Sequence, residues 1–368
     1  MLVFGTRPEA IKMAPLVRRL RDAGGQQPVV CVTGQHRQML DQVLDLFGIR
    51  PEHDLDIMRR AQGLTHVTTA VLEGMAKVLA ADRPDRVLVQ GDTTTAFAAA
   101  LAAFYAGIPV GHVEAGLRTG DIRAPWPEEM NRRLAGAIAD LHFPPTEAAR
   151  ANLLREGIHP ARIRVTGNTV IDALFDAVAI LDADPARRAA LDAALPALDP
   201  GRRILLLTGH RRESFDGGLE RVARGIRMLA DRGDLEVVHP VHLNPKVQDA
   251  AQAVLGGHPR IHLVPPLDYL PFVHLMRRAH LIVTDSGGVQ EEAPSLGKPV
   301  LVTRDTTERP EAVAAGTVEL VGTGTARLVE RAARLLDDPG AWRAMSVSHN
   351  PYGDGQAAAR IVEALRHA

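Results

Sequence analysis

RVLVQGDTTTAFAAALAAFYAGIPVGHVEAG, residues 86–116, is the stretch that decides the fold class. An apolar run at 86–90 is followed by an alanine-rich segment at 96–105 and a second apolar run at 109–113. Both runs are apolar rather than alternating, which is typical of parallel strands that are covered on both faces. The alanine-rich segment has high helix propensity. The stretch therefore predicts a β-α-β unit with a right-handed crossover.

The same rhythm continues on both sides of this unit. Further strands are predicted at 2–4, 29–33, 141–144 and 163–166, and a second series at 203–208, 236–240, 261–264, 281–284 and 299–303. Amphipathic segments such as 220–229 separate these runs. An alternation of this kind indicates an α/β protein made of doubly wound, Rossmann-like sheets.

The chain is long enough for two such domains. At 368 residues it exceeds one ordinary core. The rhythm is interrupted once, at 169–199, where a helix, the polar segment DADPARR and a second helix precede LDPGRR. We therefore expect an N-terminal domain at 1–167 and a C-terminal domain at 168–351, facing each other across a cleft. The last segment, 352–368, reads as an amphipathic helix that could cap either domain.

Composition excludes several classes of protein. The net charge is −1, so no global field attracts nucleic acid or anionic lipid. The single cysteine, Cys31, forms no intrachain disulfide, which fits a reducing compartment. No apolar run reaches the ~18 residues of a membrane span, and the opening LVFGTRPE has no features of a secretory signal. We expect a cytoplasmic protein with no nucleic-acid or membrane partner.

Polar clusters follow the predicted strands with unusual regularity. They are GTRPE (5–9), TGQHR (33–37), GDTTT (91–95), EAGLR (114–118), GHRRES (209–214), VHLNP (241–245), PPLDY (265–269), DSGG (285–288) and RDTTERPE (304–311). Ligands of open α/β sheets bind beyond the carboxyl ends of the strands. Nine clusters at such ends predict a cleft with a polar lining.

The cluster DSGG, residues 285–288, is a candidate phosphate-binding turn. Its glycines allow backbone N–H groups to approach a phosphate at a helix start, although such a sequence is also a common turn. No Gly-Lys-Ser/Thr follows it, and no G-x-G-x-x-G opens either half, which argues against a P-loop and a dinucleotide cofactor. Glu292 either binds ribose hydroxyls or lies on a solvated helix face. Arg7, Lys12 and Arg309 are candidates for pairing with a diphosphate.

Candidate acid–base residues are Asp92, Glu114, Glu128 and His210. Glu114 and Glu128 lie in the charge-rich stretch 111–133, whose acidic and basic side chains are costly to fold unless they meet partners. Asp92 precedes three threonines, so its simpler interpretation is a helix N-cap. Most of the fifteen histidines must be structural or lie on the surface. No H-E-x-x-H or Cys/His spacing is present, so we expect no bound metal.

Taken in order, the motifs resemble the non-hydrolysing UDP-N-acetylglucosamine 2-epimerases of bacteria. The matching segments are GTRPEAIKMAPL, TGQHRQMLDQV, GDTTT, GHVEAGLRTGD with PWPEEMNRR, GNTVIDAL, TGHRRESF, PVHLNP, YLPFV, TDSGGVQEEAPSLGKPVLV, RDTTERPEAV, GTVELVG and NPYGDGQA. They cover nearly the whole chain. The resemblance implies a glycosyltransferase-B type fold, with the C-terminal helix 352–368 returning to the first domain. It also implies a homodimer and chemistry without a metal or redox cofactor.

The resemblance also implies the reaction, which interconverts UDP-N-acetylglucosamine and UDP-N-acetylmannosamine for envelope or capsular polysaccharide. The C2 proton is not acidic, so the family's route is anti elimination of UDP to 2-acetamidoglucal, followed by re-addition. Asp92, Glu114 and Glu128 match the family's catalytic carboxylates, and His210 matches its catalytic histidine. We expect Asp92 and Glu114 to serve opposite faces of C2, Glu128 to act as a further acid or to hold the loop, and His210 to assist the departing diphosphate.

Binding positions carry over by motif in the same way. Those that match UDP contacts are Arg7, Lys12, Phe272, Ser286, Gly287, Gly288, Glu292 and Arg309, with Phe272 beside the uracil. Some relatives bind UDP-N-acetylglucosamine at a second, allosteric site, and the positions that match it are Gln35, His36, Gln38 and His242. Ala61 stands where those relatives carry an arginine. Relatives also have a few more residues before the first strand, so we expect either a short strand at 2–4 or a start further upstream.

The motifs are also compatible with four other functions. A glycosyltransferase of the same fold would need an acceptor pocket but no carboxylates around C2. A 2-epimerase acting on a modified UDP-N-acetylhexosamine, such as a diacetamido uronic acid sugar, would share the motifs. A hydrolysing epimerase would release free N-acetylmannosamine. A catalytically inactive nucleotide-sugar sensor would not need the carboxylate set.

Overall fold

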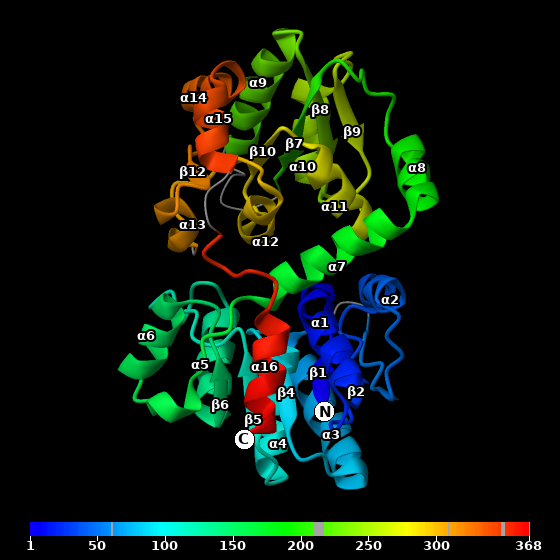
Figure 1. Cartoon of the computed structure of the whole chain (residues 1–368), viewed down its shortest axis with the longest axis vertical. Helices are drawn as coiled ribbons and strands as arrows, with labels where there is room; N and C mark the ends of the chain where they lie inside the picture. Colours follow the sequence, from blue (N-terminus) through cyan, green and yellow to red (C-terminus); the bar gives the residue numbers. More distant parts are fainter. Residues whose placement is uncertain (60–61, 210–216, 308, 347–349, 368) are drawn as a thin grey trace. The chain divides into compact units, whose positions relative to one another are not determined.

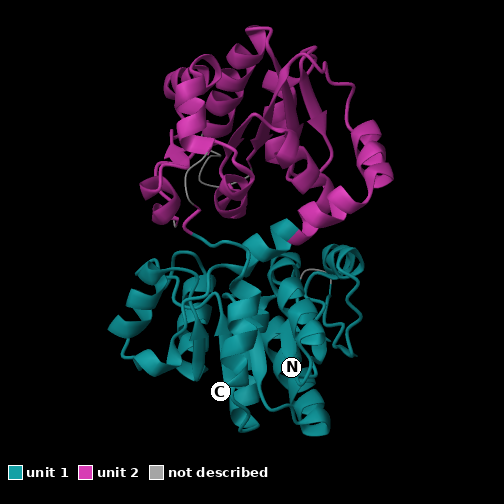
Figure 2. Ribbon diagram, in the orientation of Figure 1, with its two compact units in different colours: residues 1–175, 352–368 teal, residues 176–351 magenta. Residues whose placement is uncertain are grey.

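The chain forms two compact units, shown in different colours in Figure 2. This computed structural model describes residues 1–59, 62–209, 217–307, 309–346 and 350–367. Unit 1 comprises residues 1–175 and 352–368, and unit 2 comprises residues 176–351. The first division falls after Phe175, inside helix α7 (Thr169–Ala183), rather than after residue 167. The start of α7 stays with unit 1 because Asp172 accepts hydrogen bonds from the backbone of Ala357 and Ala358.

Unit 1 is built on one parallel sheet of six strands in the order β3-β2-β1-β4-β5-β6. This is the 3-2-1-4-5-6 order of doubly wound dinucleotide-binding folds. The strands are β1 (Leu2–Phe4), β2 (Val30–Val32), β3 (His53–Asp54), β4 (Val87–Gln90), β5 (Val110–Val113) and β6 (Leu141–Phe143).

Helices cover both faces of this sheet, as Figure 1 shows. Buried side chains of α1 (Arg7–Ala23), α2 (Arg37–Leu46) and the C-terminal α16 (Ala357–Arg366) form one core with Leu2 and Phe4 of β1. Those of α3 (Leu64–Asp82) and α4 (Thr94–Tyr105) form the other with Val3. The alternation of Leu2, Val3 and Phe4 between the two cores explains why β1 is apolar throughout. Helices α5 (Glu128–Ile138) and α6 (Glu147–Arg155) complete the unit.

Unit 2 repeats the same topology. Its parallel sheet has the order β12-β11-β10-β7-β8-β9. The strands are β7 (Arg203–Thr208), β8 (Leu235–Pro240), β9 (Ile261–Val264), β10 (Leu281–Thr284), β11 (Val300–Val302) and β12 (Val318–Leu320). The helices are α8 (Pro185–Ala194), α9 (Gly218–Asp231), α10 (Pro245–Leu255), α11 (Tyr269–Arg278), α12 (Gly287–Glu292), α13 (Pro310–Ala314), α14 (Thr325–Asp337) and α15 (Pro339–Ser346). Short 3-10 turns lie at Pro160–Arg162 in unit 1 and Ala293–Leu296 in unit 2.

The predicted fold class, two doubly wound parallel α/β sheets, is confirmed. One predicted strand was wrong, and two strands were missed. Residues 163–166 form a single bridge, from Ile163 to His142, instead of a strand. The edge strands β3 and β12 were missed, because an edge strand pairs on one side and its residues need not be apolar throughout. Within the described residues, no helix is long and apolar enough to cross a membrane.

Candidate active site

The polar loops of unit 1 meet at the point where its strand order reverses. Strands β1 and β4 are hydrogen-bonded neighbours, and β5 lies next to β4. Arg7 and Lys12 follow β1, Asp92 follows β4 and Glu114 follows β5. Because all strands are parallel, these loops lie along one edge of the sheet, where ligands of doubly wound folds bind.

Glu114 is held by three neighbouring side chains. Its φ of +59° lies in the left-handed region, which is uncommon for a non-glycine residue and is concentrated at functional sites. The carboxylate is only 4% exposed and accepts from the Lys12 ammonium at 2.7 and 2.6 Å. It also accepts from Asn168 Nδ2 at 3.1 Å and from the amide of Gln90. The site therefore supports a buried, ionised carboxylate at this position.

Lys12 was assigned from sequence to a diphosphate. In the structure its ammonium bonds both oxygens of Glu114 and is itself 15% exposed. A cation this close compensates the cost of burying the carboxylate. Any contact between Lys12 and a diphosphate stays a prediction.

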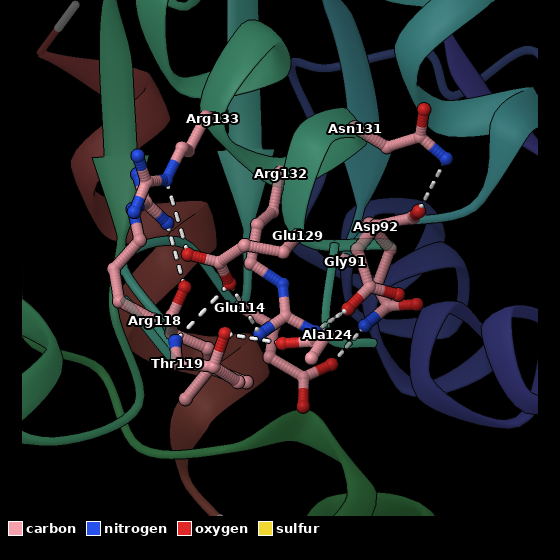
Figure 3. Close-up of polar contacts among 12 residues, drawn as sticks. Gly91, Asp92, Glu114, Arg118, Thr119, Ala124, Glu129, Asn131, Arg132 and Arg133 are labelled. Carbon is pink, nitrogen blue, oxygen red and sulfur yellow. Dashed lines mark hydrogen bonds and ion pairs between the residues drawn. The ribbon is translucent and has the colours of Figure 1, made fainter. Parts of the chain in front are cut away.

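Asp92 is not a helix cap, so that interpretation is wrong. Helix α4 begins at Thr94, and its N-cap is Thr93, whose side chain accepts from the Ala96 N–H at 2.9 Å. The Asp92 carboxylate instead pairs with Arg132, and its backbone oxygen accepts from Asn131 Nδ2 at 2.9 Å. Figure 3 shows Asp92 between these two residues of α5. The carboxylate is 28% exposed, so it can still reach a ligand.

Glu129 braces the loop before α5, which contains the cis peptide bonds Ala124–Pro125 and Trp126–Pro127. It is fully buried and accepts from Arg132 Nη1 at 3.3 Å, Arg133 Nε at 3.0 Å and the Thr119 N–H at 3.1 Å (Figure 3). Its neighbour Glu128 is the first residue of α5 and is half-buried. The Glu128 side chain forms no hydrogen bond or ion pair with any residue that the structure describes.

A buried histidine supports the turn before Asp92. His112 of β5 lies 2.7 Å, through Nε2, from the carbonyl oxygen of Gly91, whose φ is +68°. Burial lowers the pKa of His112 to about 4, although the hydrogen bond to Gly91 opposes this shift. The ring is therefore neutral at physiological pH, with Nε2–H as the donor to Gly91.

Unit 2 has an equivalent set of loops at its own reversal point, between β7 and β10. Gly287 opens α12, and a Cβ at this position would lie 2.9 Å from the guanidinium carbon of Arg309. Arg309 donates from Nε to Glu291 at 2.9 Å, which fixes its guanidinium against the glycine. The close approach of the glycine backbone to the Arg309 guanidinium supports an anion site here.

Glu292 is buried, so the solvated-face interpretation is wrong. It accepts from the Tyr269 hydroxyl at 2.7 Å. Burial and the nearby Glu292 charge raise the pKa of Tyr269 well above its usual value, so the phenol stays protonated and donates. Ser286, Gly288 and Phe272 of α11 are half-buried.

The positions assigned to a second site are divided between the units. In unit 1, the Gln35 side chain accepts from Thr95 Oγ1 at 2.9 Å, and Gln38 is exposed. Burial, together with Arg7, lowers the pKa of the half-buried His36. In unit 2, His242 is exposed. The predictions for His210 and Ala61 lie outside the described residues.

Sequence reasoning missed the residues that hold the carboxylates. These are Gln90, Asn131, Arg132 and Asn168, together with Glu9, which holds Thr93 beside Asp92. Arg132 and Asn168 were quoted only within the motifs PWPEEMNRR and GNTVIDAL, without a role. The position of Asn168 directly after the predicted strand 163–166 is the one signal in the sequence that would have drawn attention to it.

Fold and site together define a two-domain α/β protein. Two carboxylates, each beside its own cation, lie at the strand ends of the first sheet, and a glycine turn beside an arginine lies at the strand ends of the second. The model of the family "UDP-N-acetylglucosamine 2-epimerase" matches residues 18–366. The chain is 57% identical over 368 residues to the UDP-N-acetylglucosamine 2-epimerase of Escherichia coli (strain K12), covering 100% of this chain and 98% of that protein.

Comparison with solved structures supports the same family assignment. The crystal structure of UDP-GlcNAc 2-epimerase from Neisseria meningitidis bound to UDP-GlcNAc has a TM-score of 0.93 at 49% identity, covering 100% of this chain and 99% of that one. That of the Methanocaldococcus jannaschii UDP-GlcNAc 2-epimerase, in complex with UDP-GlcNAc and UDP, has a TM-score of 0.82 at 34% identity, covering 100% and 99%. The chain belongs to the UDP-N-acetylglucosamine 2-epimerase family. The predicted family and the assignment to the isomerases are thereby confirmed.

Proposed function

We propose that this protein interconverts UDP-N-acetylglucosamine and UDP-N-acetylmannosamine in the non-hydrolysing manner. The observation that carries the proposal is the pair of carboxylates in unit 1, each beside its own cation: Glu114 with Lys12 and Asp92 with Arg132. An enzyme that moves a proton at a carbon centre needs acid–base groups held in fixed positions, and carboxylates are among the side chains that serve this role. The relatives from N. meningitidis and M. jannaschii bind UDP-GlcNAc, which supports the choice of substrate.

The mechanism proposed is anti elimination followed by re-addition. A carboxylate takes the C2 proton, the C1=C2 double bond forms, and the C1–O bond breaks with its electron pair leaving on UDP. The intermediate is 2-acetamidoglucal. UDP then adds back at C1 while C2 receives a proton on the opposite face. Asp92 and Glu114 serve the two faces, and the half-buried Glu128 acts as a further acid.

Unit 2 would hold the departing diphosphate. Arg309 and the Gly287–Gly288 turn supply the positive charge and the backbone donors that stabilise it. Glu292, already bonded to Tyr269, would accept from the ribose hydroxyls, and Phe272 would lie beside the uracil. His210 would assist the leaving group. We assign Arg7 and Lys12 to the same diphosphate once substrate is bound.

The wider role follows from the same proposal. A cytoplasmic homodimer would supply UDP-N-acetylmannosamine for envelope or capsular polysaccharide. Gln35, His36, Gln38 and His242 would bind a second UDP-N-acetylglucosamine as an activator, with no metal or redox cofactor needed.

The decisive experiment is solvent exchange. Purified protein is incubated in D₂O with UDP-N-acetylglucosamine and no acceptor, and the sugars are followed by NMR. Epimerisation gives UDP-N-acetylmannosamine with deuterium at C2 in both epimers. Unchanged substrate with no deuterium contradicts the proposal and favours a glycosyltransferase of this fold. Free N-acetylmannosamine would indicate a hydrolysing enzyme, and a panel of diacetamido uronic acid UDP-sugars tests the alternative substrate.

A further inference from the structure

Glu9 is a fully buried carboxylate that contacts two of the site loops at once. It is the third residue of α1 and is 1% exposed. Its Oε2 accepts from the backbone N–H groups of Gly5 and Thr6, at 3.0 and 2.8 Å, and from Thr6 Oγ1 at 2.8 Å. Its Oε1 accepts from Thr93 Oγ1 at 2.6 Å.

The two sides of this carboxylate serve different loops. Oε2 holds the turn between β1 and α1, directly before Arg7. Oε1 holds Thr93, which directly follows Asp92 and caps α4 through the Ala96 N–H. A capping box at the start of α1 needs only the hydrogen bonds to Oε2. The bond to Thr93 spans 84 residues of sequence and has no part in the capping of α1.

Burial of the Glu9 carboxylate costs free energy. Burial raises the pKa of Glu9, and the hydrogen bonds from Thr93, Thr6 and Gly5 oppose the shift. Among the residues that the structure describes, no lysine, arginine or histidine forms an ion pair with it. Four donors thus satisfy the carboxylate without a cation, so its stabilisation depends on both loops being in place.

We propose that Glu9 is a positioning residue, which through Thr93 fixes the Asp92 loop relative to the start of α1. The inference rests on the proposed function, because it assigns Asp92 to the reacting sugar. Asp92 is then held on four sides: by Glu9 through Thr93, by Asn131 and Arg132 from α5, and by His112 through Gly91. Of these, only the contact with Glu9 also fixes the segment that carries Arg7.

The test is Thr93→Val, which removes the donated hydrogen bond but keeps the side-chain volume. We expect kcat to fall about 10- to 100-fold with little change in KM, since a displacement of about 1 Å can cost ~10²-fold. Thr146→Val is the matched control. Thr146 caps α6 through the Ala149 N–H and contacts neither Glu9 nor Asp92, so this variant loses a cap of the same kind and should keep kcat. Thr93→Ser retains the hydroxyl and should restore kcat.

A crystal structure of Thr93→Val gives a readout that does not depend on activity. We expect the Asp92 carboxylate to have moved away from Arg132. An unmoved Asp92, a kcat within twofold of wild type, or an equal loss in Thr146→Val would overturn the assignment to Glu9. Absence of turnover in the wild-type protein would instead count against the proposed function, and the position of Asp92 would still test Glu9.

Discussion

Asp92 and Glu114 have cation partners of different kinds. Glu114, 4% exposed, faces the point charge of Lys12, whereas Asp92, 28% exposed, faces the planar guanidinium of Arg132. Lys12 comes from α1 and Arg132 from α5, so the two carboxylates are fixed by independent elements. Each can therefore be neutralised without removing the support of the other.

Asp92→Asn and Glu114→Gln should each lower kcat by ~10²–10⁴-fold, the usual cost of removing a general acid or base. Both changes keep the side-chain size, and we expect UDP affinity, measured by calorimetry, to remain near that of wild type. Glu156→Gln is the control, because Glu156 pairs with Arg118 in the same unit but is 39% exposed. Wild-type rates in either of the first two variants would refute the role of that carboxylate.

Gly287 should be needed for the placement of Arg309. In Gly287→Ala, the new Cβ at 2.9 Å from the guanidinium carbon must displace a group that Glu291 holds. We expect UDP affinity to fall about tenfold, which corresponds to about 1.4 kcal/mol. A double-mutant cycle with Arg309→Ala supplies the control. If the glycine acts through Arg309, the alanine should cost little in the Arg309→Ala background, and full additivity would contradict this.

At the scale of elements, apolar patterns predicted the strands that lie inside each sheet. They failed at the edge strands β3 and β12, which are short and include the polar residues His53, Asp54 and Glu319. The sequence also placed the polar loops at the correct strand ends. It could not show that Lys12 contacts Glu114, because the two are 102 residues apart and no local pattern links them. The sequence also favoured Asp92 as the cap of α4, because Asp and Thr are both good N-cap residues. Only the backbone of the structure shows that Thr93 is the N-cap.

Helix α16 should stabilise unit 1. Ile361 is fully buried in the core shared with α1. Ile361→Ala should lower the free energy of unfolding by roughly 2–5 kcal/mol through lost burial and a cavity. Urea unfolding followed by circular dichroism measures this change. Glu363→Ala, on the exposed side of the same helix, should leave the midpoint unchanged. Equal midpoints in the two variants would show that α16 adds no stability.

At the scale of the whole molecule, both units have the same topology. Each also has a buried, neutral histidine on a strand, bonded to a backbone carbonyl of a neighbouring strand or of the turn that follows it. His112 of β5 bonds the carbonyl of Gly91 through Nε2, and His239 of β8 bonds that of Leu207 through Nδ1 at 2.9 Å. Burial lowers the pKa of each to about 4, against 6.5 for a free histidine. Burial likewise lowers the pKa of His142 in unit 1 and of His280 in unit 2 to about 4, so each unit contains two histidines that make its stability sensitive to acid.

Stability should fall as the pH drops from about 6.5 to about 4. In this window the unfolded chain binds a proton at each of these histidines and the folded chain does not, so protons favour unfolding. Each histidine should lower the free energy of unfolding by about 1.4 kcal/mol per pH unit. Above pH 6.5 neither state is protonated, and this contribution to the pH dependence disappears.

Substitution of each histidine by an amide that does not titrate distinguishes the acid sensitivity of unit 1 from that of unit 2. His112→Gln keeps a donor at the place of Nε2, and His239→Asn keeps one at the place of Nδ1. Urea unfolding at pH 7 and at pH 5 measures how much the free energy of unfolding falls between these two pH values. In a Trp126→Phe background, the fluorescence of Trp342 reports the unfolding of unit 2. His239→Asn should reduce the acid-induced loss in the Trp342 signal, and His112→Gln should not. If both variants lose stability between pH 7 and pH 5 as steeply as wild type, other groups cause the acid sensitivity.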